Sequence, residues 1–194
     1  MSETLSGRIE TGDAARKPLV DLNKVWELAK SFDQDPKKRG EFVTVVGDIA
    51  SKVNSDFVPN SDPSEVWVGS KFELPNHGTL HVDPDGLLFQ APGASVGIAV
   101  CDLREGYLDQ CTRYKRYKVE IDLGDEDGED NSAMIFCVLK NSRDGSTAST
   151  MKHGRPDDTL PERLKELSTS LSMAYAEALE LKAQPPQSKD VDAE

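Results

Sequence analysis

Aromatic residues and cysteines are both scarce in this sequence of 194 residues. Phe, Trp and Tyr together make up 6%, and there are three cysteines, Cys101, Cys111 and Cys137. An odd number of cysteines without regular spacing excludes a disulfide framework. Each cysteine lies in or near an apolar or strand-like stretch. We therefore expect buried free thiols in a reducing compartment.

Long apolar runs are also missing. The longest, "SVGIAVCDL", is far shorter than the roughly 20 apolar residues that cross a bilayer. Residues 1–18 contain acidic groups and no apolar stretch, which argues against a secretory signal or an organelle transit peptide. We expect a soluble, intracellular, cytoplasmic protein without a membrane partner.

Positive charge is the minority sign. The chain has 23 Lys and Arg against 35 Asp and Glu, a formal net charge of −12. Such a surface repels nucleic acid and anionic membranes on average. Any nucleic-acid contact would need a concentrated basic patch on one face.

Metal ligands do not group in the sequence. His77 and His81 lie in a turn-and-strand context, where four residues span roughly 13 Å, too far for one ion. The stretch "DLGDEDGED" resembles a calcium loop only in part. Aligning its glycine to the sixth position puts Leu123 and Met134 where acidic ligands are required. We expect no metal and no cofactor.

Catalytic motifs are absent as well. No GxSxG, phosphate-binding loop or dinucleotide-binding fingerprint occurs in its required context. His81 and Asp83 share a strand face at roughly 7 Å and would form an acid/base pair in a small hydrolase. Because one such coincidence is expected by chance, this is the third hypothesis, and an enzyme is less favoured than a non-enzyme.

The residues that are present indicate an α+β fold of one domain over 19–182. Apolar residues at helical spacing and plausible caps at Asp21 and Asp35 predict a helix pair over 19–58. Pro36 suits a first helical position. A strand over 41–46 is the alternative for the second helix, and the apolar stripe that continues to Val53 favours the helix.

Short runs rich in β-branched and aromatic residues fill 65–140. Turn sequences separate them, among them Asp83-Pro84-Asp85-Gly86. We expect a mostly antiparallel sheet of five or six strands, followed by a polar loop over 141–158. Polar tails over 1–18 and 183–194 are expected to be flexible.

A long amphipathic helix is predicted over 159–182. Thr159 and Glu162 fit a capping box. Its apolar positions, which we call the seam, step by four and three: Leu160, Leu164, Leu167, Leu171, Ala174, Ala178 and Leu181. The seam predicts packing either within the chain or against another copy or a partner helix.

The stretch "TRYKRYKVEIDLGDEDGED", residues 112–130, places a basic strip before an acidic loop. The strip comprises Arg113, Tyr114, Lys115, Arg116 and Lys118. In a strand, Tyr114, Arg116 and Lys118 share one face, and Arg113 and Lys115 the other. The strip is either a solvated strand or a surface for single-stranded nucleic acid, with bases stacking on tyrosine. The acidic loop lies roughly 23 Å along the chain from Lys118, so we treat the two as separate surfaces.

The favoured function is a non-enzymatic assembly or interaction protein. Such a protein would be a structural or accessory component of a virion, a phage or another multi-protein complex. It would act through the seam and the tails, with self-association or a protein partner. Single-stranded nucleic-acid binding by the basic strip is the alternative.

Overall fold

The computed structural model describes residues 18–59, 67–105, 112–124, 133–153 and 158–184. Over these residues the fold is α+β, with three helices and one seven-stranded antiparallel sheet. The helices are α1 (Leu22–Ala29), α2 (Pro36–Phe57) and α3 (Leu160–Ala183). The strands are β1 (Ser70–Leu74), β2 (Gly78–Asp83), β3 (Gly86–Ala91), β4 (Ala94–Glu105), β5 (Thr112–Asp122), β6 (Ala133–Asn141) and β7 (Thr147–Lys152).

The N-terminal helix pair forms as predicted. The Asp21 side chain accepts a hydrogen bond from Lys24 N, and the Asp35 side chain accepts one from Lys37 N, so both residues are N-caps. Residues 41–46, for which a strand was the alternative, lie inside α2. The side chains of Phe42, Val46 and Val53 are fully buried on one face of this helix, which explains why the helical spacing prevailed.

The sheet is a meander in which each strand pairs with the next along the chain. The turn at 83–86 is built as its sequence suggests, because Asp83 Oδ1 accepts hydrogen bonds of 2.9 Å from both Asp85 N and Gly86 N. The expected count of five or six strands was too low. The additional strand is β7, in the segment that we interpreted as a polar loop.

The sequence did not predict β7, because "TASTMK" shows little alternation of apolar and polar residues. It lies at one edge of the sheet and pairs only with β6 among the described strands. An edge strand tolerates polar side chains on both faces, since it buries less surface than a central strand. Met151 stands opposite Phe136 and is still 37% exposed.

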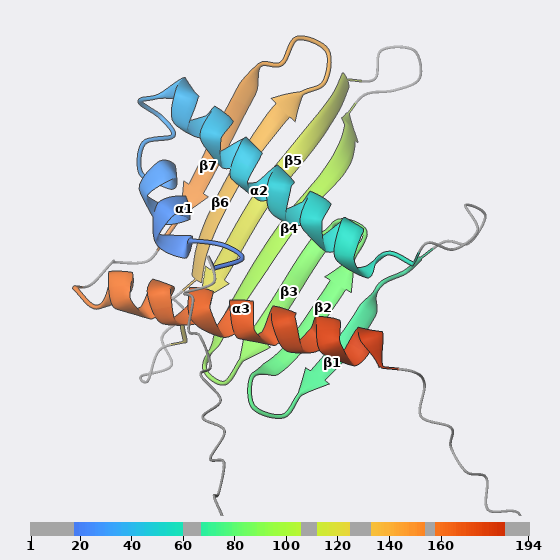
Figure 1. Cartoon of the computed structure of the whole chain (residues 1–194). Helices are drawn as coiled ribbons and strands as arrows, with labels where there is room; N and C mark the ends of the chain where they lie inside the picture. Colours follow the sequence, from blue (N-terminus) through green and yellow to red (C-terminus); the bar gives the residue numbers. More distant parts are fainter. Residues whose placement is uncertain (1–17, 60–66, 106–111, 125–132, 154–157, 185–194) are drawn as a thin grey trace, which may run out of the picture.

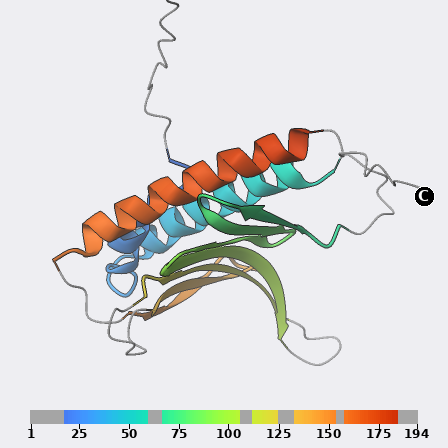
Figure 2. The same cartoon turned by 90° about the horizontal axis from the view of Figure 1, so that it is seen from below.

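All three helices cover the same face of the sheet. Figure 1 shows α2 crossing the sheet diagonally and α3 running along its lower part, and Figure 2 shows both helices on one side of the strands. Fully buried side chains from both layers form one core: Phe42, Val46, Val53, Leu80, Phe89, Val96, Ile98, Val119, Ile121, Phe136, Val138, Leu164 and Leu171.

The cap of α3 differs from the prediction. Thr159 has helical backbone angles and its side chain makes no capping hydrogen bond, so the expected capping box with Glu162 does not form. Instead, the Thr159 carbonyl oxygen accepts hydrogen bonds from the backbone N–H groups of Glu162 and Arg163. Within the described ranges, none of the helices has the length and apolar character that a membrane span requires.

Candidate functional site

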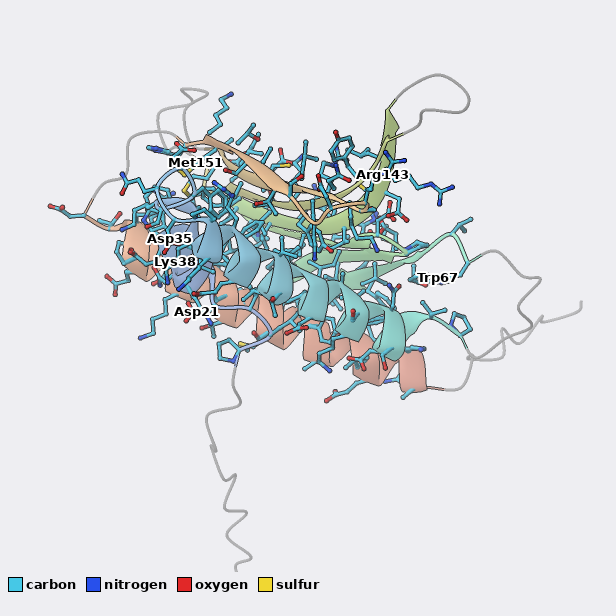
Figure 3. All side chains as sticks on the ribbon, turned by 90° about the horizontal axis from the view of Figure 1, so that it is seen from above. Asp21, Asp35, Lys38, Trp67, Arg143 and Met151 are labelled. Atoms are coloured by element: carbon cyan, nitrogen blue, oxygen red, sulfur yellow. The ribbon has the colours of Figure 1, made fainter. Side chains whose placement is uncertain are left out.

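The face of the sheet opposite the helices, which we call the open face, remains uncovered by any described helix. Strand residues alternate between the two faces, and the buried residues of each strand mark the helix side. Figure 3 shows α2 and α3 along one side of the sheet, while β4 and β5 bend away from them on the other. In its centre the open face carries Leu88, Gly97, Ala99, Cys101, Leu103, Tyr114, Arg116, Lys118, Glu120, Ile135, Cys137, Leu139 and Thr150.

The basic strip divides between the two faces, as strand alternation predicts. Tyr114, Arg116 and Lys118 lie on the open face. Arg113 and Lys115 lie on the other side, and Lys115 Nζ is 3.9 Å from a carboxylate oxygen of Asp102. The five residues therefore do not form one surface, and only three of them can meet a single partner.

Arg116 has an unusual environment for a cation on a sheet surface. Its cross-strand partners are Cys101 on β4 and Leu139 on β6. Its Nε atom is buried and has no hydrogen-bond acceptor among the described residues. Leaving a buried donor unsatisfied costs roughly 1–3 kcal/mol, so native structures seldom retain one without a reason.

No acidic residue adjoins Arg116 in the sheet. Its nearest neighbours along β5 are Tyr114 and Lys118, and its diagonal neighbours are Ala99, Leu103, Cys137 and Asn141. Together with Cys101 and Leu139, these eight positions supply apolar, small or neutral polar side chains and one further cation. Among the described sheet positions next to it, Arg116 therefore has apolar or neutral neighbours and no carboxylate.

The Lys118 ammonium group, unlike the Arg116 Nε, has a partner. Its Nζ lies 2.5 Å from Oε2 of Glu120, which shares the open face two residues further along β5. Both side chains are about one-third to one-half exposed. An exposed ion pair of this kind contributes little free energy, so Lys118 can exchange this partner for another anion at small cost.

The two described cysteines flank these cations. Cys101 is opposite Arg116 and Cys137 is opposite Lys118, and both are free, half-buried thiols. Burial raises the pKa of Cys137, while the nearby charge of Arg116 and a hydrogen bond with Thr150 oppose that rise. Strand β5 separates the two thiols, so they are two strand spacings apart and beyond disulfide reach. Cys111 lies outside the described residues.

The seam of α3 is occupied within the chain. Leu160, Leu164, Leu167, Leu171, Ala174 and Ala178 are all buried in the core, and only Leu181 is 39% exposed. In the structure these six residues pack within the chain, which is one of the two alternatives that the seam left open. The sequence could not reveal that packing partner, because the seam period is the same for either neighbour.

The structure does not support His77 and His81 as a shared site, and each has its own surroundings. Asp83, the expected partner of His81, is used as a turn residue through its two backbone hydrogen bonds. His77 Nε2 lies 3.5 Å from Glu177 Oε2 on α3. The described part of the chain holds no group of three or more His, Cys, Asp or Glu side chains arranged to bind a metal. The acidic loop at 125–131 and the tail residues 1–17 and 185–194 lie outside the described residues, whereas Ala183, expected in the C-terminal tail, is the last residue of α3.

Sequence reasoning missed Cys101, Leu103 and Leu139 as neighbours of the basic strip. They come from strands on either side of β5, and only the pairing register brings them to Arg116. Alternation along each strand predicts the face of a residue, but no sequence signal gives its position relative to the next strand.

Comparisons with models of known protein families, with curated proteins and with solved structures gave no match in any of the three.

Proposed function

We propose that the protein is a non-enzymatic interaction protein, a component of a multi-protein assembly, and that the open face of its sheet is the contact surface. One observation carries the proposal: the described helices all lie on one side of the sheet, and its other side presents half-buried apolar residues around Arg116, whose Nε lacks an acceptor among the described residues. Docking would cover the apolar side chains and bring a partner against the Arg116 side chain.

The contact surface proposed here differs from the one that the sequence suggested. The seam of α3 is buried, so a partner could reach it only by displacing the sheet or the helices. The outer side of α3 remains accessible, with Met173 52% exposed. It offers isolated apolar residues, and isolated apolar residues are common on protein surfaces.

Affinity capture with matched variants tests the proposal. Leu139→Glu places a charge in the centre of the open face, and Met173→Glu places one on the outer side of α3. We expect a polypeptide that wild type and Met173→Glu capture and that Leu139→Glu loses. Circular dichroism and a melting curve establish that each variant is folded.

Three results would contradict the proposal. The folded Leu139→Glu variant could retain the polypeptide, both variants could lose it, or wild type could capture none. If Leu139→Glu retained the polypeptide and Met173→Glu lost it, the contact surface would be the outer side of α3.

Single-stranded nucleic-acid binding is the second candidate, because Tyr114, Arg116 and Lys118 share the open face at roughly 7 Å intervals. Two observations weaken it: Arg113 and Lys115 lie on the opposite face, and Glu120 adjoins Lys118. Fluorescence anisotropy with a labelled oligonucleotide at low salt tests it. Affinity that falls with salt and is lost in Arg116→Met would support this candidate, and no binding at low salt would remove it.

A further inference from the structure

The centre of the open face has a composition that selects one kind of partner. Arg116 is a cation between Cys101 and Leu139, with Leu103 and Cys137 at diagonal positions. The Nε and one terminal nitrogen of a guanidinium form a fork that matches the two oxygens of a carboxylate. The Nε is itself buried without an acceptor among the described residues, so an oxyanion would reach it only when the Arg116 side chain turns outward.

The surrounding apolar side chains favour a carboxylate of a peptide over a phosphate of a nucleic acid. A nucleic-acid strand carries one phosphate per nucleotide and needs several cations along its path. Apart from Arg116, the neighbouring cation is Lys118, which already has Glu120. A peptide segment with a single carboxylate between apolar residues matches both the cation and Leu139, Leu103 and Ile135 around it.

A second copy of the chain is a poorer occupant. Where two open faces pair about a two-fold axis near Arg116, the Arg116 and Lys118 side chains of one copy would meet the same residues of the other. Like charges that meet at an interface oppose association. The local positive charge of Arg116, with no acidic residue at its eight neighbouring sheet positions, instead favours a partner segment that carries a carboxylate.

We infer that Arg116 anchors an Asp or Glu side chain of a partner's peptide segment, whose flanking apolar residues cover Leu139, Leu103 and Ile135. This inference rests on the proposed function, since it names the class of partner that the open face receives.

Selection from a library of random displayed peptides tests the inference without a known partner. The wild-type chain is the bait, and a 12-residue oligo(dT) is titrated in parallel. We expect selected peptides to be enriched in Asp or Glu flanked by apolar residues. A synthetic copy of the best peptide should bind Arg116→Met about 10- to 100-fold more weakly, the factor for loss of a charged hydrogen bond.

Three further variants complete the test. Arg116→Lys keeps the charge but not the fork, and its affinity should fall between those of wild type and Arg116→Met. Arg143, exposed in the turn between β6 and β7, is the matched control, and Arg143→Met should bind within about twofold of wild type. Leu139→Gln removes an apolar contact of the open face and should also weaken the peptide.

The outcomes separate failure of this inference from failure of the proposed function. Peptides without acidic enrichment, weakened by Leu139→Gln but not by Arg116→Met, would overturn the inference alone. Peptides unaffected by either variant would overturn both. Oligo(dT) bound more tightly than any peptide, or a dimer in light scattering that Arg116→Met dissociates, would assign the face to nucleic acid or to a second copy and overturn the inference.

Discussion

The Tyr175 hydroxyl on α3 donates a 2.7 Å hydrogen bond to Oδ2 of Asp56, near the C-terminal end of α2. Lys52 Nζ lies 2.8 Å from the same carboxylate oxygen, and Lys182 Nζ donates to the backbone carbonyl oxygen of Asp56. The Tyr175 ring meets Phe57 edge to face. These contacts hold α2 and α3 together on the helix side of the sheet. The open face lies on the other side of the sheet.

The first prediction concerns acid stability. Burial raises the pKa of Asp56, but hydrogen bonds from Lys52 and Tyr175 outweigh it, and the net pKa is below the ordinary value of 3.8. A carboxyl group whose pKa is lower in the folded state stabilises the fold above its unfolded pKa and loses that contribution as the pH falls through its folded pKa.

We therefore expect the difference in unfolding free energy between wild type and Asp56→Asn to be full at pH 7 and to shrink below about pH 4. Urea unfolding across this range measures it. Tyr175→Phe should cost roughly 1–3 kcal/mol at pH 7, because it removes a hydrogen bond to a charged group. A pH-independent difference for Asp56→Asn would contradict this account of the Asp56 contacts.

The second prediction compares two glycines that contact each other. Gly93 has φ +74° with no atom near an added Cβ, whereas Gly124 has φ +58° and an added Cβ would lie 2.5 Å from the Gly93 carbonyl oxygen. Both alanine variants must adopt a left-handed backbone, which costs about 1–2 kcal/mol. Gly124→Ala must in addition displace backbone, so its melting temperature should fall clearly further. Equal melting temperatures would show that the close approach is absent in solution.

The third prediction distinguishes the buried from the exposed side of α3. Leu171 is fully buried and Met173 is 52% exposed. We expect Leu171→Ala to destabilise the fold by about 2–5 kcal/mol and Met173→Ala to change it by less than about 0.5 kcal/mol. Chemical denaturation measures both. A small effect at Leu171 together with a change in oligomeric state would mean that the seam packs between copies.

The fourth prediction concerns the Cys137 thiol. Because burial raises its pKa above the usual thiol value, alkylation should require a higher pH than alkylation of a free cysteine. A Cys101→Ser, Cys111→Ser variant leaves Cys137 as its one cysteine for the measurement. Bound acidic peptide should slow the reaction further by covering the thiol. An alkylation profile like that of free cysteine would contradict the half-buried position.

Much of the local structure could be predicted from the sequence. Asp21 and Asp35 cap their helices because a short acidic side chain beside an apolar helical repeat fixes a helix start through local hydrogen bonds. The turn at Asp83 and the placing of Arg116 and Lys115 on opposite faces also depend only on neighbouring residues, so the sequence predicted both. Features that depend on distant partners were missed: β7 forms on β6 without an apolar repeat, and Thr159 does not cap although its spacing fits.

The candidate site illustrates the same limit. The sequence placed Tyr114, Arg116 and Lys118 on one face, but it could not show that Cys101 and Leu139 flank Arg116 or that its Nε has no acceptor. Those facts depend on the register of three strands. Register is set by turns and core packing over the whole sheet rather than by the residues of β5.

Methyl chemical-shift mapping with the best acidic peptide tests the central claim, that the open face is the interaction surface, most directly. The methyl groups of Leu88, Leu103, Ile135 and Leu139 are expected to shift and broaden on titration. The buried methyl groups of Leu164 and Leu171 on α3 should hardly move, and in Arg116→Met the same shifts should require about 10- to 100-fold more peptide. Shifts confined to α3 residues, or unchanged in Arg116→Met, would contradict it.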